Sequence, residues 1–119
     1  MATTRRQQRV NHLLQQEVSK LLEFELSDPR LQGVTVSGVE ISPDLKHARV
    51  FIVSTGDAAQ ETEVRHGLQS ATPFLRRELS RRIQLRAVPE IHFAFDHSIE
   101  HADRIERLLR EVHDESQPK

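Results

Sequence analysis

Cysteine, tryptophan and tyrosine are all absent from this chain of 119 residues. Without cysteine the protein can form no disulfide, no thiolate zinc site and no cysteine nucleophile, which fits a reducing compartment. Apart from histidine, the aromatic side chains are therefore limited to five phenylalanines. Because base stacking needs exposed aromatic rings, any nucleic acid would be bound more through its backbone and shape than through stacked bases.

Long apolar runs are also missing. No segment approaches the roughly 18 apolar residues that cross a bilayer. The first residues are polar and basic, without the apolar core of a secretory signal. We therefore expect a soluble, cytoplasmic protein with no membrane contact. The length predicts one domain over residues 1–113, followed by a disordered tail at 114–119.

Positive charge is unevenly distributed along the chain. Seventeen basic and 18 acidic residues give a net charge of −1. Residues 1–12 nevertheless contain three arginines and no acid, and residues 73–90 contain five arginines against two glutamates. Such an asymmetry can create a local positive field on a nearly neutral molecule.

Hydrophobic periodicity predicts alternating helices and strands. The strand at 34–41 changes phase near Gly38, which predicts a bulge there. It should form an antiparallel hairpin with the next strand. The predicted elements are helix 5–26, strand 34–41, strand 47–54, helix 60–71, a second helix from Thr72 to about Leu85, strand 90–96, and a last helix capped by Ser98.

This order is α-β-β-α-kink-α-β-α, and it predicts an α+β fold in which helices pack on one face of a three-stranded mixed sheet. The last helix contributes an apolar stripe of its own. The members of that stripe are Ile99, Ala102, Ile105, Leu108, Leu109 and Val112.

The junction Ala71-Thr72-Pro73 is the first candidate site. Threonine is a good N-cap and proline suits the first helical position, so a helix should begin here. Its free N–H groups and the arginines that follow would bind an anion such as phosphate. The alternative is a solvated face with incidental arginines. The predicted RNA-binding residues are Arg5, Arg6, Arg9, Ala71, Thr72, Arg76, Arg77, Arg81, Arg82 and Arg86.

Evidence for catalysis is weak. His97 and His101 are four residues apart, and His92, Asp96 and Glu100 lie nearby in sequence, but nothing fixes a common geometry. We predict no enzyme, no catalytic residue, no metal site and no cofactor. Two alternatives to RNA binding remain, a protein-interaction module without direct RNA contact and a metal-dependent hydrolase.

Several motifs, in one order from about Arg5 to Leu109, are similar to those of a known family. They include Arg9-Val10, Asp28-Pro29-Arg30-Leu31, Val34 to Ser42 with Asp44-Leu45, Ala48-Arg49-Val50-Phe51, Phe74-Leu75-Arg76, Leu85-Arg86, Val88 to Phe93, and Asp96 with Ser98-Ile99-Glu100. On these motifs the chain resembles the ribosome-binding factor A family of bacterial small-subunit assembly factors.

The resemblance implies a type II KH-like domain that binds the immature 30S subunit and its 16S rRNA. It also implies a monomer that assists late 30S maturation, rRNA processing and cold adaptation, and that an assembly GTPase helps to release. The family commonly has Ala-x-Gly at the helix kink, where this chain has Ala71-Thr72-Pro73. Proline donates no N–H, so the kink should be rigid and the neighbouring arginines should carry the binding.

Overall fold

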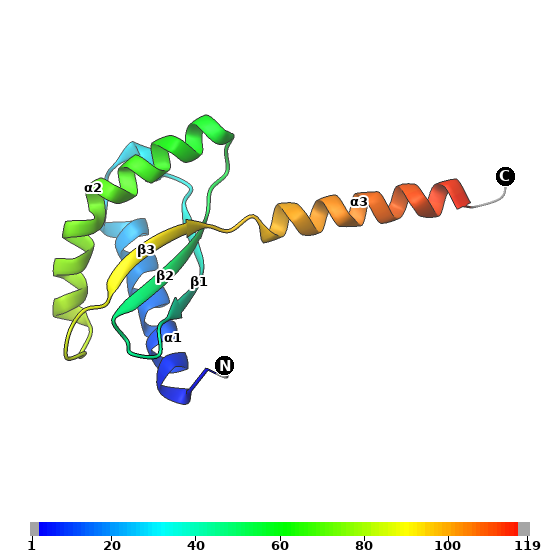
Figure 1. Cartoon of the computed structure of the whole chain (residues 1–119). Coiled ribbons are helices and arrows are strands. Elements are labelled where there is room, and N and C mark those ends of the chain that lie inside the picture. The colour runs from blue at the N-terminus through cyan, green and yellow to red at the C-terminus, as the bar shows by residue number, and fades with distance from the viewer. Residues whose placement is uncertain (1–2, 117–119) are drawn as a thin grey trace.

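A three-stranded sheet with two helices on one face forms the body of the protein, and a third helix extends away from it (Figure 1). The computed structural model describes residues 3–116, and describes their side chains except at 99–103 and 113–116. The helices are α1 (Arg5–Lys20), α2 (Ala58–Arg82) and α3 (Ser98–Ser116). The predicted α+β class and three-stranded sheet are confirmed.

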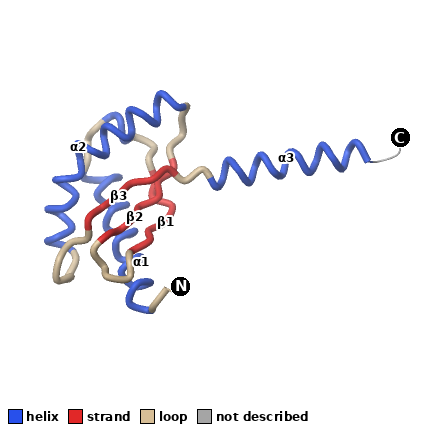
Figure 2. The backbone as a smooth tube through the Cα atoms, in the orientation of Figure 1, coloured by secondary structure: helices blue, strands red, loops and turns tan. Residues whose placement is uncertain are grey.

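The central strand of the sheet is β2 (His47–Val53), with β1 (Thr35–Ile41) antiparallel on one side and β3 (Glu90–Phe95) parallel on the other (Figure 2). The predicted hairpin is therefore present. Its register shifts between Val36 and Gly38, which leaves Ser37 as the extra residue of the expected bulge.

Alternation along β2 explains why the helices pack where they do. Ala48, Val50 and Ile52 are completely buried, while the residues between them are exposed or half-buried. Helix α1 buries Leu14 and Val18 against this face, and α2 adds Leu75 and Leu79, with its C-cap Ile83 also buried. One continuous core thus joins both helices to one side of the sheet.

Helix α1 begins at a capping box. The Thr4 hydroxyl accepts a hydrogen bond from the Gln7 backbone N–H, and the Gln7 side chain accepts one from the Thr4 N–H. After Lys20 the helix widens into one π-helical turn, Leu21–Glu25. The chain then leaves the helix before Asp28-Pro29, close to the end predicted from sequence.

Helix α2 is one continuous helix, so the predicted separate helix starting at Thr72 is wrong. Its N-cap is Asp57, which forms a capping box with Gln60. Pro73 lies inside the helix, and the Thr72 hydroxyl donates to the Leu68 carbonyl oxygen at 2.8 Å instead of capping a new N-terminus. Apolar packing on both sides of the proline keeps the helix together.

The predicted kink survives as a bend in α2, visible about midway along the helix in Figure 1. Proline supplies no N–H to the Gln69 carbonyl and its ring crowds that turn, so the helix bends there. Val64 and Leu68 are buried before the bend, and Leu75 and Leu79 are buried after it. The bend lets both halves of α2 contact the core.

Gly67 lies where α2 approaches the short 3₁₀ helix Pro29–Leu31. A Cβ atom at this position would come within 2.9 Å of Leu31 Cδ2 and 3.3 Å of Arg30 Cβ. Glycine ordinarily weakens the interior of a helix. The structure shows that the glycine permits close packing.

Helix α3 differs from the sequence prediction. It extends from the sheet without packing on it (Figure 1), and its apolar side chains Ile105, Leu108, Leu109 and Val112 are 44–64% exposed. Its stripe therefore has no partner among the described parts of the chain. The helix continues to Ser116, past the predicted start of the tail at residue 114, and residues 117–119 lie outside the described ones.

Asp96 connects the bulge in β1 to the start of α3. Its carboxylate accepts hydrogen bonds from the Ser98 backbone N–H at 2.9 Å and from the Ser37 hydroxyl at 2.7 Å. Ser98 was predicted to cap α3, but it serves as a donor to Asp96. Hydrogen bonds from Ser98 and then Ser37 lower the pKa of Asp96 to about 2.

Replacing Ser37 with alanine should raise the pKa of Asp96 towards the ordinary value of 3.8, because one of the donors that stabilise its anion is removed. The lowered pKa stabilises the fold above about pH 4, and this contribution is lost as the pH falls towards 2. Carboxyl NMR titration of both proteins measures the change. An Asp96 pKa that stays at about 2 would contradict it, and Ser54→Ala provides a control.

Candidate nucleic-acid interface

Three cationic side chains from distant parts of the sequence surround one hollow of about 400 Å³. Arg6 comes from the first turn of α1, Lys46 from the loop between β1 and β2, and Arg86 from the loop between α2 and β3. Asp44 and the apolar Leu45 complete part of the wall. We call the surface formed by Arg5, Arg6, Arg9, Lys46 and Arg86 the basic end.

The β1–β2 loop is held by its own hydrogen bonds. The Ser42 hydroxyl donates to Asp44 at 2.6 Å, and the Lys46 N–H donates to the same carboxylate oxygen at 3.0 Å. The Ser42 bond and then the Lys46 bond lower the pKa of Asp44. Leu45 takes a positive φ of 62° and packs against the core. Lys46 is therefore presented from a fixed loop.

The first turns of α1 offer further positive charge. Arg5, Arg6 and Arg9 are exposed, and the first turn contains no acidic residue. No ion pair holds any of these three guanidinium groups among the described side chains. Positive charge here opposes the helix dipole, so an anion at this end stabilises the helix.

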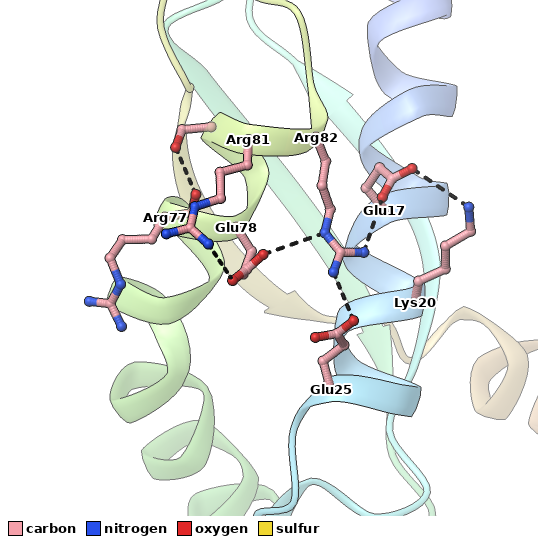
Figure 3. A network of polar contacts seen from close by, with 8 residues as sticks. Glu17, Lys20, Glu25, Arg77, Glu78, Arg81 and Arg82 are labelled. Carbon is pink, nitrogen blue, oxygen red and sulfur yellow. Dashed lines mark hydrogen bonds and ion pairs between the residues drawn. The ribbon is translucent and has the colours of Figure 1, made fainter.

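Arg82 has a structural role instead. Its guanidinium lies among three carboxylates, at 2.8 Å from Glu25, 3.6 Å from Glu78 and 3.7 Å from Glu17 (Figure 3). The hydrogen bond that it donates to Glu25 is the main cause of a raised Arg82 pKa. Because Glu17 and Glu25 lie on α1 and the turn that follows it, Arg82 ties α2 to that segment.

The other predicted RNA-binding arginines of α2 are more available. Arg81 is highly exposed and makes only a long ion pair of 3.8 Å with Glu78. Arg76 and Arg77 are exposed, and Figure 3 shows the Arg77 guanidinium pointing away from the carboxylate network. These two side chains are free to meet an anion.

The junction at Ala71 and Thr72 does not form the predicted anion site. Ala71 is 6% exposed, and Thr72 is half-buried with its hydroxyl bound to Leu68. Inside a continuous helix there are no free N–H groups to hold phosphate. Lys46, in contrast, was missed, because only the folded hairpin brings this isolated lysine to Arg6 and Arg86.

A second polar cluster lies on the outer face of the sheet, where no site was predicted. His47, Glu90 and His92 place one potential ligand atom each within 4.8 Å of the others. His92 was considered with Asp96 and Glu100, but Asp96 is bound to serines and the side chain of Glu100 lies outside the described ones.

Residues 6–109 match the family profile described as Ribosome-binding factor A. The match covers most of the chain. The chain belongs to the ribosome-binding factor A family. The ribosome-binding factor A of Anaeromyxobacter dehalogenans is 45% identical over 118 residues, covering 98% of this chain and 86% of that one. That of Thermomicrobium roseum is 41% identical over 112 residues, covering 94% and 87%.

Solved structures of ribosome-binding factor A have the same fold. The crystal structure from Thermus thermophilus has a TM-score of 0.70 at 24% identity, covering 77% of this chain and 97% of that one. Thermus coordinates fitted into a cryo-EM map of a 30S complex score 0.58 at 23% identity, covering 81% and 97%. The description of the family names a factor that binds the ribosome.

Among the described residues, no helix is long and apolar enough to span a bilayer.

Proposed function

We propose that this protein binds the immature 30S ribosomal subunit through its 16S rRNA and assists late subunit maturation and rRNA processing. A family relative has been fitted into a map of a 30S complex, which supports the choice of partner. The observation that carries the proposal is the convergence of Arg6, Lys46 and Arg86 on one hollow. No catalytic group is assigned, because the proposed role is binding.

Phosphates of rRNA are the ligands that suit the basic end. Arginine guanidinium groups can each hold two phosphate oxygens, and a lysine adds a compact positive charge. The scarcity of exposed aromatic rings favours contacts to the RNA backbone over stacked bases. Arg76 and Arg77 form a second proposed contact, whereas Arg82 and Ala71 are left out because one is ion-paired and the other is buried.

Reversing the three charges around the hollow tests this proposal. The triple variant Arg6→Glu, Lys46→Glu, Arg86→Glu should bind purified immature 30S subunits about tenfold more weakly or worse at low salt. It should also reduce the slope of log affinity against log salt by about 2 to 3, since three phosphate contacts are lost. Binding is measured by fluorescence anisotropy of labelled protein over a salt series.

The matched control carries the same three changes on α3, at the exposed residues Arg104, Arg107 and Arg110. Circular dichroism of both variants checks that the fold is intact. If the two triple variants lose affinity and salt dependence equally, net charge alone explains the binding and the basic end is not the site.

A monomeric state, a role in cold adaptation and release by an assembly GTPase are proposed from the family resemblance. A cytoplasmic location is proposed from the composition of the chain. Binding to a protein partner is the second candidate function, favoured by the exposed apolar side chains Leu108, Leu109 and Val112 on α3. Subunit association that survives nuclease treatment of the rRNA and persists in the basic-end variant would favour that candidate.

A further inference from the structure

We propose that His47, Glu90 and His92 form a binding site for a divalent transition-metal ion of the zinc class on the outer face of the sheet. This inference does not depend on the ribosomal role. Among the described residues, the ligand atoms of these three side chains converge closely enough to hold an ion, since each lies within 4.8 Å of the others.

Strand pairing brings the three side chains together. In the parallel register His47 pairs with Glu90, and Arg49 pairs with His92. Their neighbours Ala48 and Ile91 are buried against the helices, so His47, Glu90 and His92 project from the opposite face. The backbone of two adjacent strands therefore fixes the positions of all three ligands.

The distances fit a zinc ion. His47 Nδ1 lies 3.2 Å from His92 Nε2 and 3.7 Å from Glu90 Oε2, and His92 Nε2 lies 4.0 Å from Glu90 Oε1. Ligand atoms around tetrahedral zinc, with bonds of about 2.0–2.2 Å, are separated by about 3.4 Å. The two imidazole nitrogens already lie close to this separation, and the two Glu90 distances, measured to different oxygens of one carboxylate, exceed it by about 0.3–0.6 Å. The Glu90 side chain is exposed, so it can turn one oxygen towards both imidazoles.

The ligand types select the class of metal. Two imidazoles and one carboxylate favour zinc and its neighbours over magnesium or calcium, which prefer oxygen ligands. Without metal, the two imidazole nitrogens at 3.2 Å share a hydrogen bond, and a cation would take the place of its proton.

The site is open to solvent. The three side chains are 51–60% exposed, so at least one coordination position faces water. His47 and His92 also border a shallow hollow of about 520 Å³ that contains Arg49 and Glu40. Glu40 is the cross-strand partner of Arg49 in the register of the hairpin, and both residues line this hollow. His47 directly follows Lys46, so a bound cation would add positive charge beside the basic end.

Zinc titration of the full chain tests the proposal. Protein without a polyhistidine tag is stripped with a chelator, dialysed and titrated with zinc chloride in a calorimeter. We expect one zinc ion per chain. His92→Ala and the isosteric Glu90→Gln should each weaken binding at least about tenfold, since even indirect partners of a metal contribute this much. His66→Ala, which removes an exposed histidine of α2, should leave binding unchanged.

A second measurement does not depend on the variants. Imidazole ¹⁵N chemical shifts of the wild-type protein should change on His47 and His92 when zinc is added. The proposal would be overturned by any of three results. These are the absence of saturable zinc binding, an equal loss of zinc affinity in His66→Ala and His92→Ala, and unchanged ¹⁵N shifts on His47 and His92.

Discussion

Replacing Leu75 with alanine should destabilise the protein by about 3–5 kcal/mol. Leu75 is completely buried on the sheet side of α2, among the largest side chains of the core. Alanine would leave a cavity that helix and sheet cannot close without losing other contacts. Since a domain of this size has a total stability of about 5–15 kcal/mol, the loss is a large fraction of it.

Urea denaturation followed by far-ultraviolet circular dichroism measures this effect, because the chain has no tryptophan or tyrosine for fluorescence. Leu109→Ala is the matched control. Leu109 is 64% exposed on α3, so the same change should alter stability by no more than about 0.5 kcal/mol. Equal effects of the two substitutions would mean that α3 packs on the core in solution.

Replacing Pro73 with alanine should stabilise the protein by about 1–2 kcal/mol. Alanine restores the missing N–H to the Gln69 carbonyl and removes a penalty of about 3 kcal/mol for proline inside a helix. The greater freedom of the unfolded alanine chain offsets about 1 kcal/mol of this gain. Pro73 is exposed, so the change removes little buried surface.

Thermal and urea unfolding of Pro73→Ala measure the gain, with Gln69→Ala in the same exposed stretch as the control. Stability equal to or below that of the wild type would show that packing on the sheet, not the proline ring, imposes the bend. Residual dipolar couplings along α2 then report whether the helix has straightened.

The sheet and the two packed helices could be predicted because their signals are local. The apolar residues Ala48, Val50 and Ile52 alternate along β2 and share one buried face, and the phase change near Gly38 predicted the bulge. The prediction of a helix start at Thr72-Pro73 was wrong because the same dipeptide also suits the interior of a bent helix. Only the buried residues on both sides of the bend decide between these, and they depend on tertiary packing.

The site could be predicted only in part. The sequence identifies the arginines but does not show which of them form ion pairs within the protein. Arg82, for example, is paired with Glu17, which lies 65 positions earlier in the chain. Lys46 and the His47–His92 pair were missed for a related reason. The histidine pair depends on the register between β2 and β3, which are joined only through α2, and the position of Lys46 depends on the folded hairpin. The apolar stripe of α3 was recognised correctly as a pattern, but it has no partner among the described residues.

The parallel pairing of β2 with β3 also has a consequence for folding during synthesis. The hairpin of β1 and β2 is local and can form early, whereas β3 pairs only after the whole segment 54–89 has folded back across the sheet. Arg86 lies at the end of that segment, so it reaches Arg6 and Lys46 only when β3 docks. A nascent or truncated chain that lacks β3 keeps its other cations but not the three-sided hollow, which makes the hollow a marker of completed folding.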